Sequence, residues 1–191
     1  MSTNALSGKF ELMVKVYPGG KLSQHLDTMP IGESVDFKHI PFNVKIQYPF
    51  NKAKIGMLVG GTGITPMIQA LHAVLGTEGD STAVSMLYGS QKSTNILATE
   101  VLDEWSSAFP GRLDVTHVLS AEPEGSSWTG PKGFITPELI AEKLPGPSED
   151  CLIFVCGPPP MYDALCGPRG EAELSGALKD MGYAAEQVIK F

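Results

Sequence analysis

Short apolar runs without charges recur along the chain from about residue 55 onward, separated by longer segments that mix apolar and polar residues. Runs such as Ile55 to Val59 and Leu152 to Val155 have the continuous hydrophobicity of parallel strands covered on both faces. Strands are predicted at 55–59, 84–88, 113–119, 152–156 and 187–190, and helices near 66–75, 97–108, 136–144 and 171–181. This order predicts an α/β domain with a doubly wound, parallel, five-stranded sheet.

The first fifty residues follow a different pattern. Phe10 to Tyr17 is rich in β-forming residues and mostly alternates between apolar and polar side chains, and Pro18-Gly19-Gly20 breaks the run. Strand-like character continues to about Val44, and only Ser23 to Thr28 indicates a helical turn. The polar join from Asn51 to Lys54 divides the chain into predicted regions 1–53 and 54–191.

Two turns carry the candidate chemistry, and each follows a predicted buried strand and leads into a helix-like segment. They are Gly60-Gly61-Thr62-Gly63-Ile64-Thr65-Pro66-Met67 and Cys156-Gly157-Pro158-Pro159-Pro160-Met161. Glycines let backbone N–H groups approach a phosphate, and Thr65 as N-cap with Pro66 at the first helical position would aim a helix N-terminus at the ligand. Because open α/β sheets bind ligands at the carboxyl edge of their strands, both turns are predicted to face one ligand.

The amino-acid composition argues against several classes of function. The 191 residues are 42% hydrophobic and 18% charged, as in an ordinary globular protein, and no apolar run is long enough to span a membrane. Met1-Ser2-Thr3-Asn4 has neither a signal-peptide nor a transit-peptide pattern. Three cysteines without a C-x-x-C pair argue for a reducing compartment, and the four histidines lack metal-ligand spacing, so no metal is expected.

Charge is unevenly placed along the chain. The net charge of −7 argues against nucleic-acid binding. Residues 1–54 hold seven lysines against four acids, a net charge of +3, whereas the remainder holds seven Lys and Arg against seventeen acids, a net charge of −10. The basic region is either a solvated surface or a docking face for an acidic protein partner.

These turns, taken together, resemble the pyridine-nucleotide domain of the ferredoxin-reductase-like flavoproteins, in particular the NADH-cytochrome b5 reductase family. The resemblance covers nearly the whole chain. It includes Val14 to Tyr17, Gly20 to Gln24, Trp128 to Ile135 and the final aromatic, Phe191. The run Phe37 to Lys45 is more similar to the plant and algal mitochondrial-type branch than to the animal enzymes.

The resemblance implies a fold, an activity and partners. It implies that 1–53 is a partial antiparallel β-barrel flavin domain and that 54–191 is the NAD(P)H-binding domain. It further implies FAD as cofactor, NADH as hydride donor, an acidic heme protein such as cytochrome b5 as electron acceptor, and a mitochondrial location. The family's R-x-Y-T-P flavin motif is expected upstream of Gly8, so the chain is expected to be N-terminally truncated; a natural short isoform is the alternative.

The resemblance also assigns site residues. In the first region, Gly20 to Gln24 places a lysine, backbone amides and a hydroxyl in one loop, which suits a flavin pyrophosphate but also an ordinary polar turn. The implied FAD contacts are Met13, Lys15, Pro18, Lys21, Leu22, Ser23 and Thr65. The other implied cofactor contacts are Gly60, Gly61, Thr62, Gly63, Ser120, Gly157, Pro158, Pro159, Met161 and Phe191.

Cys156 and Ser120 each have two interpretations. Cys156 is either a packing residue at a strand end or a catalytic residue that lies beside the nicotinamide and orients it, without acting as a nucleophile. By the resemblance, Ser120 stands where the animal NADH enzymes carry an aspartate. The nearby acids Glu122 and Glu124 would still repel a 2′-phosphate, so NADH is favoured over NADPH. The alternative interpretation is that this segment is a solvated loop without a role in nucleotide binding. Alternatives for the whole chain are the reductase portion of a nitrate-reductase-like enzyme and a redox-inactive nucleotide-binding module.

Overall fold

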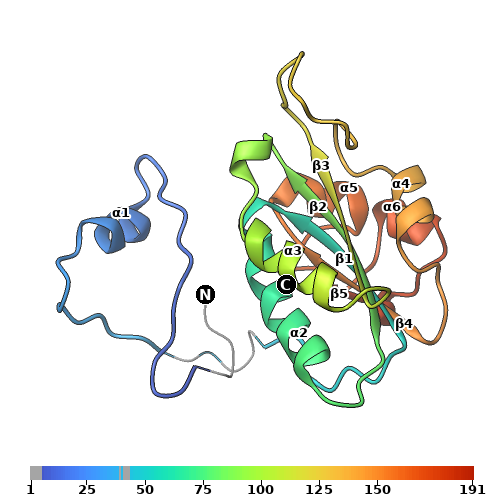
Figure 1. The fold of residues 1–191 in the computed structure, drawn as a ribbon, viewed down its shortest axis with the longest axis horizontal. Coiled ribbons are helices and arrows are strands. Elements are labelled where there is room, and N and C mark those ends of the chain that lie inside the picture. The colour runs from blue at the N-terminus through green and yellow to red at the C-terminus, as the bar shows by residue number, and fades with distance from the viewer. Residues whose placement is uncertain (1–5, 39, 41–43) are drawn as a thin grey trace. The chain divides into compact units, whose positions relative to one another are not determined.

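The computed structural model describes residues 6–38, 40 and 44–191, which divide into an N-terminal unit, Met1–Lys45, and a C-terminal unit, Ile46–Phe191. Figure 1 shows both units as ribbons. Residues 46–53, which the sequence pattern placed in the first region, group with the C-terminal unit. The predictions made on Met1 to Asn4, on His39, and on residues 41–43 of the run Phe37 to Lys45 lie outside the described residues.

The C-terminal unit contains the predicted five-stranded parallel sheet, in the order β3-β2-β1-β4-β5. The strands are β1 Lys54–Gly60, β2 Ala83–Ser90, β3 Leu113–Leu119, β4 Cys151–Cys156 and β5 Val188–Lys190. Ile55 to Val59 on β1 and Cys151 to Val155 on β4 are buried along their whole length. These two strands occupy the centre of the sheet, which explains why their sequences are apolar on both faces.

Helices cover both faces of the sheet. They are α2 Ile64–Gly76, α3 Thr99–Ala108, α4 Pro137–Lys143, α5 Pro159–Leu165 and α6 Gly176–Asp180. In the view of Figure 1, α2 and α3 lie in front of the sheet. On the other face, Leu58, Ile153 and Val155 form one buried core with residues of α4, α5 and α6, including Ile140, Leu165 and Leu178. The doubly wound prediction is confirmed.

The predicted helix at 171–181 is shorter than expected, because only Gly176–Asp180 is helical. The ammonium group of Lys190 donates to the carbonyl oxygens of Pro168, Glu171 and Glu173 at 3.2, 3.1 and 3.0 Å. A loop whose carbonyls turn toward one lysine cannot also direct them along a helix axis. The helix ends as predicted, with Gly182 at a left-handed φ of +90°.

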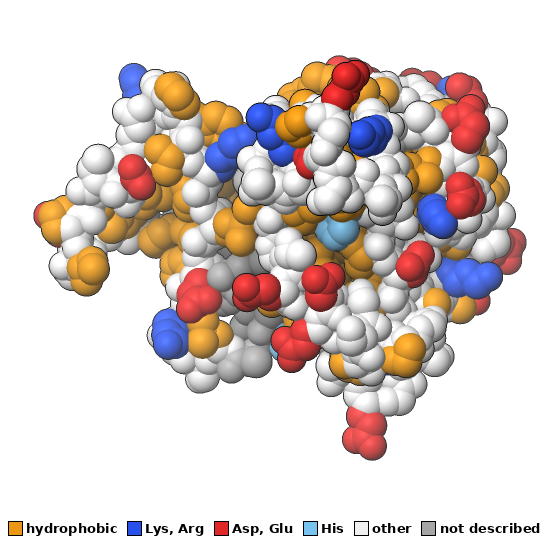
Figure 2. Space-filling model, turned by 45° about the horizontal axis from the view of Figure 1, so that its top comes forward, with side chains coloured by type: hydrophobic (Ala, Val, Ile, Leu, Met, Phe, Trp, Pro, Cys, Tyr) orange, Lys and Arg blue, Asp and Glu red, His pale blue; other side chains and the backbone are white. Residues whose placement is uncertain are grey.

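The N-terminal unit has less regular secondary structure than the sequence pattern predicts. Its described residues, 6–38, 40, 44 and 45, contain the helix α1 Lys21–Thr28 and no strand. Phe10, Leu12 and Val16 are 56%, 55% and 43% exposed, and Figure 2 shows hydrophobic side chains at the surface of this unit. β-propensity expresses packing against paired strands. The prediction of strands here was wrong for the described residues, because an alternating sequence forms a strand only when a neighbouring strand pairs with it.

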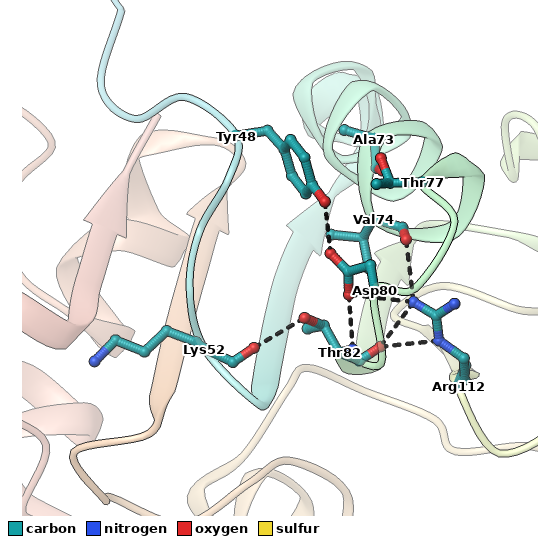
Figure 3. A network of polar contacts seen from close by, with 8 residues as sticks. All are labelled: Tyr48, Lys52, Ala73, Val74, Thr77, Asp80, Thr82 and Arg112. Carbon is teal, nitrogen blue, oxygen red and sulfur yellow. Dashed lines mark hydrogen bonds and ion pairs between the residues drawn. The ribbon is translucent and has the colours of Figure 1, made fainter.

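A polar network fixes the segment that leads into β1 (Figure 3). The hydroxyl of Tyr48 donates to Asp80 Oδ2 at 2.9 Å, and Asp80 Oδ1 accepts from the Thr82 amide at 2.8 Å and from Arg112 Nη2 at 3.4 Å. Thr82 Oγ1 donates to the Lys52 carbonyl at 2.9 Å. Residues 46–53 are therefore tied to the loop before β2, at the amino edge of the sheet.

Asp80→Asn is expected to lower the unfolding free energy by about 1 to 2 kcal/mol at pH 7, since hydrogen bonds to a charged group are lost. Burial raises the pKa of Asp80, but hydrogen bonds from Thr82 and Tyr48 and the charge of Arg112 outweigh it, so this pKa is lowered. A lowered folded-state pKa contributes stability above the unfolded value of about 3.9, and this contribution is lost as the pH falls through the folded-state pKa.

Urea unfolding at pH 7 and at pH 3 measures this effect. The difference between wild type and Asp80→Asn should shrink at the lower pH, because the unfolded carboxylate binds a proton below about pH 3.9 while the folded one resists it, so the stabilisation is lost progressively toward the lowered folded-state pKa. Glu78→Gln, which neutralises an exposed acid in the same loop, is the matched control and should stay within about 0.5 kcal/mol of wild type at both pH values. A difference for Asp80→Asn that does not depend on pH would contradict the assignment.

Candidate nucleotide-binding site

The two glycine-containing turns lie side by side at the carboxyl edge of the sheet. They follow β1 and β4, which are hydrogen-bonded neighbours with Val59 opposite Cys156. The chain runs from β1 outward through β2 and β3 and then returns to place β4 on the other side of β1. The turns therefore occupy the switch point of the strand order, where open α/β sheets bind their ligands.

Three glycines allow the turns to touch through their backbones. A Cβ at Gly63 would overlap the carbonyl group of Cys156. A Cβ at Gly60 would lie 2.7 Å from Pro158 Cδ, and one at Gly157 would lie 2.5 Å from Met161 Sδ. Close packing of the two turns thus requires Gly63 and Gly60, whereas a Cβ at Gly157 would mainly meet the flexible end of Met161 in its own turn.

Gly61 has a different requirement. Its φ is +53°, in the left-handed region, and nothing lies within 4 Å of an ideal Cβ at this position. The conformation rather than a neighbouring group demands glycine. The backbone here is open on its outer side, as close approach of a ligand requires.

The helix after the first turn begins earlier than predicted. Gly61–Gly63 forms a 3₁₀ turn, Gly63 is the N-cap of α2 with helical φ and ψ of −61° and −7°, and Ile64 is the first helical residue. The prediction of Thr65 as N-cap was therefore wrong, because winding starts before that residue. No side chain caps this 13-residue helix, and the amide of its first residue, Ile64, donates to the carbonyls of Gly61 and Thr62.

Tyr88, at the end of β2, holds the first turn and was missed in the sequence. Its buried hydroxyl donates to the Gly61 carbonyl at 3.1 Å and accepts from the Leu97 amide at 3.3 Å. Burial raises the pKa of Tyr88, so the hydroxyl keeps its proton. An aromatic residue with a polar tip at the end of an otherwise apolar strand was the available signal.

Cys156 is half-buried at the end of β4. Burial raises the pKa of its thiol, and the opposing effects of a hydrogen bond with Tyr162 and of the Arg169 charge do not offset it. A neutral thiol is a poor nucleophile at physiological pH. The environment of Cys156 therefore suits a wall of the site rather than covalent chemistry.

Phe191 lies beside Cys156. Its amide donates to the carbonyl of Val155 at 3.0 Å, and its ring meets that of Phe154 edge to face at a centroid distance of 5.3 Å. The structure thus brings together Phe191, Cys156 and both glycine-containing turns within the C-terminal unit.

Ser120 is exposed directly after β3, where its amide donates to the Ser90 carbonyl at 3.0 Å. Glu122, expected as a loose surface acid, instead accepts from the amide and hydroxyl of Ser93 at 2.7 and 2.9 Å. The hydrogen bond from the Ser93 amide is the main cause of a lowered pKa for Glu122. The loops after β2 and β3 are therefore joined by a fixed negative charge.

The candidate flavin residues of the N-terminal unit gather in one loop. Lys21, Leu22 and Ser23 open α1, after Gly20 as N-cap. Ser23 Oγ accepts from the Tyr17 amide and donates to the Gly20 carbonyl, both at 3.2 Å. Lys15 Nζ lies 5.0 Å from the centre of the Tyr17 ring, and Met13 and Pro18 are exposed in the same segment. The segment thus carries two lysines and opens a helix, features that are typical of diphosphate binding.

The described part of the chain contains neither a candidate metal site nor a membrane-spanning helix. Within residues 6–38, 40 and 44–191, no group of three His, Cys, Asp or Glu side chains is arranged to hold a metal ion. Across the same ranges, no helix has the length and apolar character needed to cross a membrane.

Family models match both parts of the chain. The oxidoreductase NAD-binding domain model matches residues 57–167, and the oxidoreductase FAD-binding domain model matches residues 1–48. The first match spans more than half of the chain and includes both glycine-containing turns.

Curated relatives and solved structures agree with these models. NADH-cytochrome b5 reductase 2 of Aspergillus niger is 41% identical over 96% of this chain, and that of Aspergillus terreus is 39% identical over all of it. The chain spans 58% and 60% of the length of these two relatives. The cytochrome b5 reductase domain of Ulva prolifera nitrate reductase has a TM-score of 0.74 at 25% identity, covering 94% of this chain and 70% of that one. The CS-b5R domains of human Ncb5or have a TM-score of 0.68 at 27% identity, covering 92% and 46%.

Proposed function

This chain belongs to the oxidoreductase NAD-binding domain family, and we propose that it functions as an FAD-dependent NADH-cytochrome b5 reductase. In the proposed reaction, a hydride passes from NADH to FAD, and single electrons then pass to a heme protein. The observation that carries the proposal is the backbone packing of the Gly60–Gly63 turn against Cys156 and Gly157 at the switch point of the sheet. The curated relatives named NADH-cytochrome b5 reductase 2 support the choice of reaction.

The nucleotide contacts follow from the geometry of the two turns. The open backbone of the 3₁₀ turn and the positive end of α2 would bind the pyrophosphate of NADH, with Thr62 and Thr65 as neighbouring hydroxyls. Gly157, Pro158, Pro159 and Met161 would form the opposite side, and the prolines keep that side rigid at low entropic cost. This arrangement holds the nucleotide without a deep pocket.

Cys156 and Phe191 would form the wall beside the nicotinamide. Hydride transfer needs the donor carbon close to the flavin, so the protein contributes orientation and exclusion of water. The raised pKa of the Cys156 thiol keeps it uncharged against the ring. For the flavin itself, Met13, Lys15, Pro18, Lys21, Leu22 and Ser23 are the proposed contacts in the N-terminal unit.

Partner and location are part of the proposal. The excess of lysine in residues 1–54 favours an acidic heme protein such as cytochrome b5. The three free cysteines favour a reducing compartment, and the family resemblance favours the mitochondrion.

A second candidate is the reductase part of a nitrate-reductase-like enzyme, which the fold match to the Ulva prolifera domain favours. Both candidates share NADH and FAD and differ in the electron acceptor. A redox-inactive nucleotide-binding module would differ from both. Visible absorbance of the purified chain titrated with FAD, followed by NADH-dependent ferricyanide reduction, tests the proposal. Absence of flavin binding together with absence of ferricyanide reduction would favour the inactive module.

Cys156→Ser is expected to lower kcat about 3- to 10-fold and to change KM for NADH less than about twofold. The smaller oxygen changes the shape of the nicotinamide wall, while the distant pyrophosphate contacts remain. Steady-state kinetics with ferricyanide measure both constants. Cys151→Ser, at the other end of the same strand, is the matched control and should leave both constants unchanged. If the two variants behave alike, Cys156 is only a packing residue.

A further inference from the structure

Tyr162 places a hydroxyl group at the carboxyl edge of β4. The residue lies in α5, directly after the second glycine-containing turn, and its side chain is only 3% exposed. The hydroxyl oxygen lies 2.5 Å from the Phe191 carbonyl oxygen and 3.3 Å from that of Val155. A tyrosine whose ring lies in the core therefore reaches the two main-chain groups that border the site.

The Val155 carbonyl is shared between two of these contacts. It accepts the Phe191 amide at 3.0 Å and also lies within reach of the Tyr162 hydroxyl. Phe191 is thus held on both sides of its main chain, by Val155 through its amide and by Tyr162 through its carbonyl. Its ring packs on Phe154.

Burial raises the pKa of the Tyr162 hydroxyl and of the Cys156 thiol, so each keeps its proton at neutral pH. The two groups also influence each other's pKa, which raises that of the phenol further and lowers that of the thiol by less than burial raises it. The phenol has a single proton, and its shortest contact is with the Phe191 carbonyl, which accepts it.

We propose that Tyr162 is a positioning residue that fixes Phe191 next to the end of β4 through the hydrogen bond from its hydroxyl group to the Phe191 main chain. The role rests on the proposed function, in which Phe191 is part of the wall that orients the nicotinamide. Without the hydroxyl, Phe191 loses one of its two main-chain hydrogen bonds, and the donor carbon spends less time in its reactive geometry.

Tyr162→Phe tests the proposal, because it removes the hydroxyl and keeps the ring. Tyr183→Phe is the matched control. Tyr183 is 4% exposed, and its hydroxyl donates to the Pro145 carbonyl at 2.6 Å, so that substitution also deletes one buried hydroxyl bound to a carbonyl. Both variants lose a comparable hydrogen bond, but only Tyr162 borders the site.

Two readouts are compared on the full chain with added FAD. In the NADH-ferricyanide assay, Tyr162→Phe should lower kcat about tenfold with KM for NADH within about twofold, and Tyr183→Phe should match wild type. In amide hydrogen exchange followed by NMR, the Phe191 amide should be protected in wild type and in Tyr183→Phe. It should exchange at least about tenfold faster in Tyr162→Phe.

The outcomes separate this inference from the proposed function. An unprotected Phe191 amide in wild type, or unchanged exchange in Tyr162→Phe, overturns the positioning role. Faster exchange with unchanged kcat also overturns it, because Phe191 would then be anchored without effect on the reaction. If wild type with FAD reduces no ferricyanide, the proposed function fails, and the exchange rates alone decide whether Tyr162 holds Phe191.

Discussion

Gly63→Ala is expected to lower the unfolding free energy of the C-terminal unit by about 2 to 3 kcal/mol and to weaken NADH binding at least about tenfold. The added Cβ would overlap the main-chain carbonyl of Cys156. Neither group is the end of a flexible side chain, so the clash is relieved only by moving one turn away from the other. That movement separates the two halves of the proposed nucleotide site, so stability and binding fall together.

Gly76→Ala is the matched control for this prediction, since Gly63 precedes α2 and Gly76 is its last residue. Nothing lies within 4 Å of an ideal Cβ at Gly76. The control should be neutral or more stable by about 0.5 to 1 kcal/mol, as expected when alanine replaces glycine in a helix. Urea unfolding with a constant m-value and NADH fluorescence titration measure the two effects. A Gly63→Ala protein that unfolds and binds like wild type would show that the turns do not pack as described.

The central sheet was predictable because burial on both faces imposes a simple pattern. Residues 55–59 and 152–155 are covered by helices on each side, so their sequences are uniformly apolar. The turns after them were recognisable from glycine and proline, whose backbone properties are local. These features depend on few residues and need no knowledge of distant parts of the chain.

Features that depend on distant partners were missed or misplaced. The start of α2 was misplaced because the preceding 3₁₀ turn has no side-chain signal of its own. Helix α6 was predicted too long because Lys190, in the last strand, draws the carbonyls of the preceding loop. Tyr88 and Tyr162 act through contacts 27 and 29 residues away along the chain, which a local pattern does not reveal.

In the segment Phe10 to Tyr17, the sequence pattern predicted a strand that the structure does not contain. Its alternation is the correct local signal for a strand, but strand formation requires a hydrogen-bonded neighbour. The helix α1 that follows it was indicated only by the short stretch Ser23 to Thr28, whereas the structure starts it at Lys21. Local propensity was therefore informative about the loop that opens α1 and misleading about the strand before it.

Ser120→Asp is expected to widen the preference for NADH over NADPH by about tenfold in kcat/KM. The wild-type preference itself is expected to be about 10- to 100-fold, equivalent to roughly 1.4 to 2.7 kcal/mol. Ser120 can bond a ribose hydroxyl but does not repel a 2′-phosphate. Glu122 supplies the existing repulsion, since its carboxylate is held on Ser93 and its pKa is lowered by that hydrogen bond. A second carboxylate at position 120 adds to this charge directly after β3.

Both nucleotides are compared with ferricyanide as acceptor, on the full chain with added FAD and at one fixed ionic strength, because exposed charges are screened by salt. Ser127→Asp is the matched control, since it adds the same charge to an exposed serine farther along the same loop. It should change the NADH to NADPH ratio by less than about twofold. An unchanged ratio in Ser120→Asp would show that position 120 does not face the ribose. A wild-type kcat/KM with NADPH equal to or above that with NADH would refute the NADH assignment, since a fixed carboxylate at Glu122 would then offer no barrier to the phosphate.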